Sequence, residues 1–143
     1  MTTLKCLSLR QPWAWAVVDG GKNIENRTWN TRVRGPILIH AAKGMTGAEY
    51  DVAMLFCKER GLELPNPKLL ARGGIVGAAR LIGVLPPERN TLSPFDWHMA
   101  EQHGFILAAV TPLPFREHRG ALGFFSVVLS TPEKRILIGA GLL

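Results

Sequence analysis

Alternating apolar and polar residues near the N-terminus predict a first β-strand at Leu4–Arg10. Leu7 and Leu9 fall on one face of this strand, whereas Ser8 and Arg10 fall on the other, because successive side chains of a strand point to opposite faces. The strand therefore has one side suited to a core and one side that carries polar groups.

Two segments that open with proline carry the end signals of helices. Pro12–Val18 begins with proline, which is favoured in a first helical turn, and ends at Gly20. Pro94–His103 has Ser93 as its predicted N-cap and again places proline in the first turn. We expect a short helix at each place.

A longer helix is predicted from Thr46 to Gly61. Thr46 and Glu49 have the spacing of a capping box, and Gly61 supplies a stop. The apolar residues that recur at helical spacing, and that we expect to pack inward, are Ala48, Val52, Leu55 and Phe56. We interpret this helix as scaffold.

Five further segments have the composition of strands. They are Ile24–Trp29, Pro36–Ala42, Gly73–Leu85, Phe105–Val110 and Gly123–Leu129. Glycines spaced through the long aliphatic run at Gly73–Leu85 favour a bent barrel strand. Between the strands we expect a basic turn at Asn30–Gly35, a loop at Leu62–Arg72 and a turn-rich stretch at Thr111–Gly120. The pattern predicts an α+β domain with a closed or nearly closed sheet.

Composition places the chain among ordinary globular proteins. Its 143 residues are 47% hydrophobic and 20% charged, which is enough for one domain, residues 1–143, with a real core. No apolar run has the length of a membrane span, and the N-terminus lacks a signal-peptide pattern. We therefore expect a soluble, cytoplasmic domain that binds no membrane.

The cysteines and histidines predict no metal site and no cofactor. Cys6 and Cys57 lie too far apart in sequence for a zinc motif or a disulfide framework, which fits a reducing compartment. His98 and His103 are five residues apart and do not share a helix face. No Gly-rich phosphate loop, serine-elbow pattern or His-Glu-x-x-His motif is present.

The positive charge is concentrated at the N-terminal end. The formal net charge is +6, and residues 1–45 alone carry seven basic and two acidic side chains, a balance of +5. A basic stretch of this kind is either a solvated face or an electrostatic footprint for phosphates and acidic ligands.

The same stretch contains an unusual polar group. On a strand, Glu25, Arg27 and Trp29 point together, and Lys22 follows directly after the preceding glycine turn. Charges on one strand face either line a polar cavity or lie in solvent, since unpaired buried charge is strongly disfavoured.

An indole and a histidine allow two interpretations each. Trp13 packs in the core or forms a pocket wall, because base stacking uses exposed aromatic faces beside cations. His40, in a buried strand, is either a satisfied core residue or part of a site.

Four segments, in order along the chain, resemble the ASCH (activating signal cointegrator homology) domain family. They are Leu7–Ala14, the signature Gly20-x-Lys22-x-x-Glu25-x-Arg27, Arg34–Ala41 and Arg119–Phe125. The resemblance covers nearly the whole chain. It implies a PUA-like β-barrel, with a mixed and mostly antiparallel sheet, flanking helices and a cleft for RNA or modified nucleotides.

Enzymes occur in the wider group that this sequence resembles. Some relatives hydrolyse the acetyl amide of acetylated cytidine, and the resemblance implies that they use the signature lysine, a threonine three residues later and a distant glutamate. This chain has Lys22 but carries Glu25 at the threonine position, so the proposed nucleophile is missing. Other members are described as ribonucleases, but no catalytic set for that reaction can be matched here.

We expect a module that binds RNA, single-stranded DNA or a modified nucleotide through a basic cleft. Arg10, Lys22 and Arg27 would contact phosphates or base edges, Glu25 would orient Arg27 or accept from a base amine, and Trp13 or Trp29 would stack. The predicted ligand-binding residues are Ser8, Arg10, Trp13, Lys22, Glu25, Arg27, Trp29 and His40, and the predicted nucleic-acid surface is Arg32, Arg34 and Lys43.

Two alternatives remain open at this point. One is a metal-independent hydrolase of a nucleoside or RNA, with Lys22 and Glu25 as acid and base and His40 assisting. Against it, a carboxylate beside Lys22 stabilises the protonated, unreactive ammonium. The other is a protein-interaction domain that recruits partners in transcription or translation.

Overall fold

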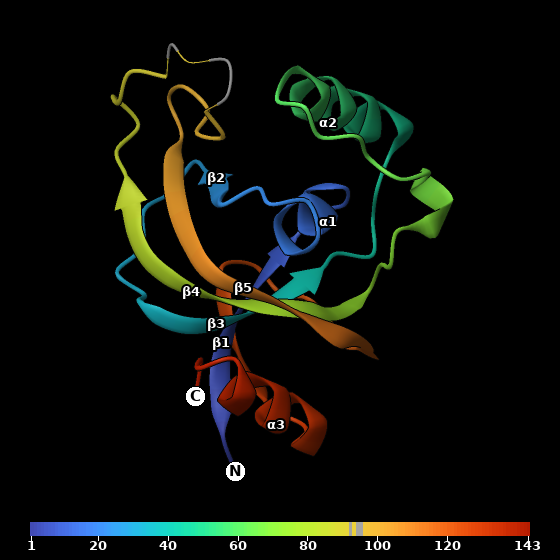
Figure 1. Ribbon diagram of the computed structural model, residues 1–143, viewed down its shortest axis with the longest axis vertical. Coiled ribbons are helices and arrows are strands. Elements are labelled where there is room, and N and C mark those ends of the chain that lie inside the picture. The colour runs from blue at the N-terminus through green and yellow to red at the C-terminus, as the bar shows by residue number, and fades with distance from the viewer. Residues whose placement is uncertain (92, 94–95) are drawn as a thin grey trace.

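Figure 1 shows the chain as a computed structural model that describes residues 1–91, 93 and 96–143. Three α-helices are present in this part of the chain: α1 (Trp13–Val18), α2 (Gly47–Glu59) and α3 (Thr131–Gly139). The strands are β1 (Thr3–Leu9), β2 (Ile24–Arg27), β3 (Gly35–Ala41), β4 (Gly74–Leu85), β5 (His103–Glu117) and β6 (Phe124–Val128), and a 3-10 turn lies at Pro67–Leu69. None of the helices described is long and apolar enough to cross a membrane.

The strands form one mixed sheet in the order β2-β5-β4-β3-β1-β6. Among the described residues, β1 and β3 pair in parallel and the other neighbours are antiparallel. Within the described residues, β2 and β6 are the two ends of the order and no pairing joins them. The predicted α+β class and mixed sheet are confirmed, but the closed barrel is not.

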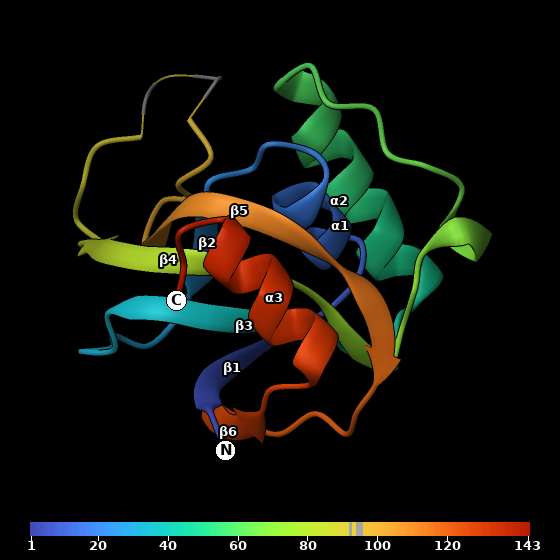
Figure 2. The same cartoon turned by 60° about the horizontal axis from the view of Figure 1, so that its bottom comes forward.

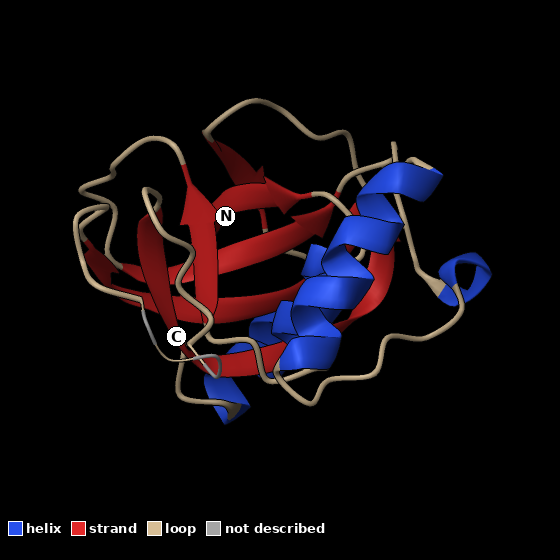
Figure 3. Cartoon of the chain, turned by 90° about the horizontal axis from the view of Figure 1, so that it is seen from above, coloured by secondary structure: helices blue, strands red, loops and turns tan. Residues whose placement is uncertain are grey.

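The sheet curves strongly because β4 and β5 are long and irregularly paired (Figure 3). Their register shifts at several points, including between Ile75 and Gly77. A Cβ at Gly77 would lie 2.8 Å from Cγ2 of Val18, so glycine at this position lets α1 approach the sheet closely. The turn predicted at Thr111–Gly120 is wrong over most of its length, since β5 continues to Glu117.

Two apolar cores lie on opposite faces of the sheet. Leu7, Ile37 and Ile39 face the first core, which α1 covers with Val17. The second core contains Cys6, Leu38 and Val127 together with Leu137 of α3. Figure 2 shows α3 lying across this second face, beside both termini. The predicted alternation along β1 is confirmed.

Helix α2 forms where it was predicted, but its inward face is different. The hydroxyl of Thr46 accepts from the backbone N–H of Glu49, as the predicted N-cap requires. The fully buried residues of this helix are Ala53 and Cys57. Of the four residues predicted to pack inward, Val52 and Leu55 are 66% and 58% exposed, so that part of the prediction is wrong.

Two differences from the predicted elements occur in the second half of the chain. The described residues between 93 and 102 contain no helix, so the predicted helix Pro94–His103 is not observed, and Pro94 itself lies outside the described residues. Helix α3 was not predicted. Its N-terminus carries a complete capping box, in which Ser130 and Glu133 each bind the other's backbone N–H.

Candidate functional site

The signature lysine lies inside the protein beneath α1. Lys22 follows the left-handed Gly21, and its side chain is 1% exposed. Its Nζ donates to the backbone oxygen of Ile24 and lies 3.8 Å from Oε1 of Glu25. It also sits over the ring of Trp13, at 5.2 Å from the centroid. Burial lowers the pKa of Lys22, and the neighbouring Glu25 carboxylate partly offsets that effect.

Arg27 links the edge strand β2 to β1. Its Nε donates to Oε2 of Glu25 at 2.9 Å, and its Nη2 donates to the backbone oxygen of Ser8 at 2.7 Å. The guanidinium also lies 5.8 Å from the ring centroid of Trp29. The structure brings Glu25 and Arg27 together on β2, whereas the predicted strand Ile24–Trp29 ends at Arg27, so Trp29 reaches Arg27 from the bend that follows the strand.

A hollow of about 310 Å³ opens in front of this cluster. The residues around it, here called the indole hollow, are Ser8, Arg10, Trp13, Glu25, Asn26, Arg27, Thr28, Trp29 and Gln102. The ring of Trp29 is held edge-on against Phe105 and Phe124, at 5.3 and 5.9 Å between centroids. Lys22 lies behind the wall of this hollow, so it supports Glu25 and Trp13 and does not face the opening.

Both arginines of the indole hollow already have carboxylate partners. Arg10 donates to Glu49 of α2 through Nε at 2.5 Å and through Nη2 at 2.6 Å. These hydrogen bonds lower the pKa of Glu49 to about 2. Arg27 is paired with Glu25 in the same way. The hollow therefore combines two indole walls with charges that largely cancel, which suits a flat, polar-edged ligand better than a bare anion.

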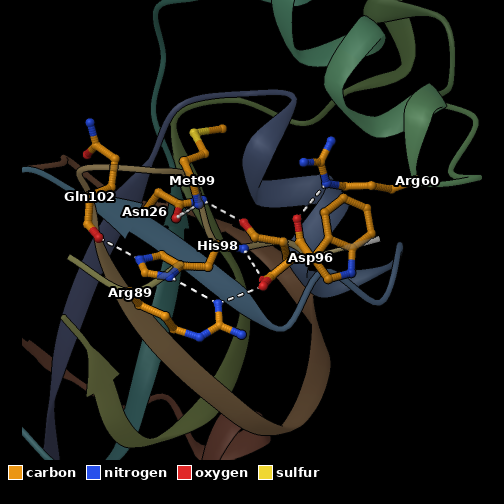
Figure 4. A network of polar contacts seen from close by, with 8 residues as sticks. Asn26, Arg60, Arg89, Asp96, His98, Met99 and Gln102 are labelled. Atoms are coloured by element: carbon orange, nitrogen blue, oxygen red, sulfur yellow. Dashed lines mark hydrogen bonds and ion pairs between the residues drawn. The ribbon is translucent and has the colours of Figure 1, made fainter. Parts of the chain in front are cut away.

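The chain between residues 96 and 102 is fastened over this region by a polar network (Figure 4). The Asn26 side chain donates to the backbone oxygen of Trp97 at 3.0 Å and accepts from the N–H of Met99 at 2.8 Å. His98 donates through Nε2 to the backbone oxygen of Gln102 and accepts at Nδ1 from Nη1 of Arg89. These contacts place Gln102 beside the indole hollow.

Arg60 and Arg89 hold the same segment from two other sides. Nε of Arg60 donates to the backbone oxygen of Asp96 at 2.7 Å, and Nη1 of Arg89 donates to its carboxylate at 2.6 Å. The Arg60 guanidinium also covers Phe56 of α2, at 3.5 Å from the ring centroid. The segment is thus tied to α2 as well as to β2.

A second and larger hollow lies at the carboxyl ends of the parallel strands β1 and β3. It has a volume of about 680 Å³ and is here called the histidine hollow. The residues around it are Ser8, His40, Ala42, Lys43, Gly73, Glu117, His118, Arg119, Gly120, Ala121 and Leu122. Ser8 and His40 are directly paired across the two strands and point away from the first core.

His40 is buried and fully hydrogen-bonded. Its Nε2 lies 2.7 Å from the backbone oxygen of His118, which can only accept, so Nε2 carries the proton. Its Nδ1 then accepts from the Ser8 hydroxyl at 2.8 Å. Burial lowers the pKa of His40, against the opposing effect of the His118 carbonyl, and this favours the neutral ring.

The predicted site residues do not form one basic cleft. Lys43 lies at the histidine hollow, and Arg34 lies at a third hollow, together with His103 and Pro87. Arg32 is exposed on the connection between β2 and β3. The sequence analysis missed Asn26, Thr28 and Gln102, and among the described residues no group of three potential metal ligands is found.

Comparisons with known proteins agree on one family. The family model described as ASCH domain matches residues 7–120. The chain is 36% identical to "Activating signal cointegrator 1" of Mus musculus over 110 residues, which is 75% of this chain and 19% of that protein. It is 35% identical to "Activating signal cointegrator 1" of Homo sapiens over 83 residues, 56% of this chain and 14% of that protein. The match thus spans less than a fifth of either relative.

Proposed function

The chain belongs to the ASCH domain family, and on that premise we propose that it binds RNA, single-stranded DNA or a modified nucleotide, taking a base into the indole hollow. The curved sheet with helices on both faces is compatible with the PUA-like fold that the family resemblance implies. The proposal rests on the residues around the hollow.

The observation that carries the proposal is the pair of indoles on one opening. Trp13 and Trp29 are both half-buried, so each keeps part of its ring accessible while its packing against neighbours holds it rigid. Stacking of a base on such a ring is worth about 1–3 kcal/mol and tolerates any base, because every base has a π-face.

Polar groups at the rim would read the edge of the stacked base. The Gln102 amide and the Thr28 hydroxyl line the hollow, and within the described residues neither side chain has a hydrogen-bond partner. Glu25 orients Arg27 with Oε2, while its Oε1 lies 3.8 Å from Nζ of the buried Lys22. Asn26, by contrast, is committed to the backbone of residues 97 and 99.

The two alternatives receive less support from the geometry. A hydrolase with Lys22 as acid or nucleophile needs that amine to reach the ligand, whereas Lys22 lies behind the wall of the hollow. A protein-interaction role is compatible with the word cointegrator in the relatives' name, but the matched region is a small part of those proteins.

Titration of the protein with nucleosides and short RNA or DNA oligonucleotides tests the proposal. Trp29→Ala should lower affinity by about 5- to 150-fold, since stacking is worth about 1–3 kcal/mol and about 1.4 kcal/mol corresponds to a factor of ten. Trp15→Ala, on the same helix as Trp13 but outside the hollow, is the matched control. Gln102→Ala tests whether the amide at the rim contributes to affinity, and it leaves the packing of both indoles unchanged.

Two results would overturn the proposal. One is the absence of binding to every nucleoside and oligonucleotide at low salt. The other is a loss of affinity in Trp15→Ala that equals the loss in Trp29→Ala, because a base in the indole hollow does not touch Trp15.

A further inference from the structure

We propose that the histidine hollow holds the phosphodiester backbone next to the base bound in the indole hollow, so that the ligand is a strand of at least two nucleotides. This inference rests on the proposed function and extends it. Lys43 and Arg119, which line the histidine hollow and not the indole hollow, would form this second contact region.

The two hollows adjoin along the end of β1. Ser8 belongs to the walls of both. Arg10, at the rim of the indole hollow, places its guanidinium against Gly44, where a Cβ would lie 3.2 Å from Nη1. Gly44 directly follows Lys43, which lines the histidine hollow. A strand that leaves the indole hollow past Ser8 therefore reaches Lys43 next.

The cations of the indole hollow are paired with carboxylates, whereas, among the described residues, those of the histidine hollow are unpaired and can bind phosphate. The arginines of the indole hollow are both paired with carboxylates. In the described part of the chain, the side chains of Lys43 and Arg119 form neither ion pairs nor hydrogen bonds, and both residues are exposed. Unpaired cations can exchange their counterions for phosphates at little cost.

One acidic group opposes them. Glu117 also lines the histidine hollow and is exposed, so two unpaired cations face one carboxylate there. The balance of these three exposed side chains therefore stays positive.

The floor of the histidine hollow adds no negative charge. The Ser8 hydroxyl donates to His40, and the buried ring is held neutral with its other nitrogen on the His118 carbonyl. The loop above approaches this floor closely: a Cβ at Gly120 would lie 2.9 Å from Cε1 of His40 and 3.3 Å from Oγ of Ser8. Glycine at position 120 therefore lets the loop lie close to this floor. The main charged groups of the histidine hollow are then the cations at its rim.

The test compares ligands of increasing length with a charge-deleted protein. The double variant Lys43→Ala/Arg119→Ala should bind a nucleoside as the unmodified protein does, but should bind a tetranucleotide more weakly. For two lost phosphate contacts on a single strand, the slope of log K against log salt should become shallower by about 1.4. The control is Lys68→Ala/Arg135→Ala, which removes two exposed cations elsewhere.

The outcomes separate this inference from the proposed function. Nucleoside binding that depends on Trp29, with tetranucleotide binding reduced no more in the double variant than in the control, overturns the second hollow and leaves the base site standing. A protein that binds no nucleoside and no oligonucleotide overturns both. A reduced affinity of Lys43→Ala/Arg119→Ala for the tetranucleotide, with the shallower salt slope, supports phosphate binding at the histidine hollow.

Discussion

At the scale of single residues, Lys22 was predicted to contact a ligand but lies buried behind the wall of the indole hollow. The signature spacing predicted Lys22 beside Glu25, and the structure shows Trp13 as a further neighbour. Sequence could not show its burial, because the cover comes from α1 and from tertiary packing. A buried amine that is bonded to a backbone carbonyl holds the wall of the indole hollow in place.

The first prediction concerns the pH dependence of that lysine. Its pKa in the folded protein is lowered below 10.5, so between the folded and unfolded pKa values the unfolded chain binds more protons than the folded chain. The free energy of unfolding of the unmodified protein, relative to that of Lys22→Met, should therefore rise with pH in this interval, by at most about 1.4 kcal/mol per unit. Urea denaturation of both proteins from pH 7 to pH 10.5 measures it. A difference independent of pH would show that the folded pKa is not lowered.

The second prediction concerns the pair at the floor of the histidine hollow. Ser8→Ala removes the donor to Nδ1 of His40 and leaves a buried ring nitrogen unpaired, which should lower the free energy of unfolding by about 1–3 kcal/mol. Chemical denaturation measures the change. Ser126→Ala, an exposed serine on β6, should change stability by less than about 0.5 kcal/mol. Equal effects of the two substitutions would contradict the account of His40.

At the scale of elements, periodicity and glycine placement predicted five strands close to their observed positions. The sequence pattern could not show how far β5 extends, because Pro112 and Pro114 indicate a turn. Prolines are accepted there because the pairing with β4 is irregular, with Gly77 opposite Pro112 next to register shifts. For helix α3 the sequence does carry a signal, since Ser130 and Glu133 have the spacing of a capping box.

The third prediction concerns the anchoring of α3. Glu133 is 2% exposed and accepts two hydrogen bonds from Arg116 of β5, both at 2.8 Å, besides capping its helix. Arg116→Ala leaves this buried carboxylate without its cation and should lower the free energy of unfolding by about 2 kcal/mol. Thermal denaturation measures it, with the exposed Arg135→Ala on α3 as control. No difference between these variants would show that the pair does not anchor the helix.

The fourth prediction concerns the tie between α2 and β1. Glu49→Gln removes the carboxylate that holds Arg10, so the arginine becomes available to a phosphate. Affinity for a single-stranded oligonucleotide should rise, and the slope of log K against log salt should steepen by about 0.7 for one added phosphate contact. The control is Glu59→Gln, which also removes one negative charge but lies at the far end of α2 from Glu49. A larger gain in Glu59→Gln than in Glu49→Gln would contradict a specific role of Arg10.

At the scale of the whole molecule, the charge pattern predicted a functional region but not its arrangement. Seven of the basic residues fall in residues 1–45, yet Arg34 and Lys43 end at different hollows from Arg10 and Arg27. Arg34 directly precedes β3 and Lys43 follows it, so the length of this strand separates the two cations. Gln102 was missed because it lies far from Arg27 in sequence; the pairing of β2 with β5 and the hydrogen bond from His98 bring it there.

The central claim, that a base occupies the hollow between Trp13 and Trp29, is tested most directly by the indole N–H signals in a ¹H–¹⁵N NMR titration with a nucleoside. The protein has four tryptophans, so the four signals report separately on two residues of the hollow and on Trp15 and Trp97. The account predicts that the signals of Trp13 and Trp29 shift most, with Trp15 nearly unchanged. Shifts confined to Trp15 and Trp97, or no shift at saturating nucleoside, would contradict it.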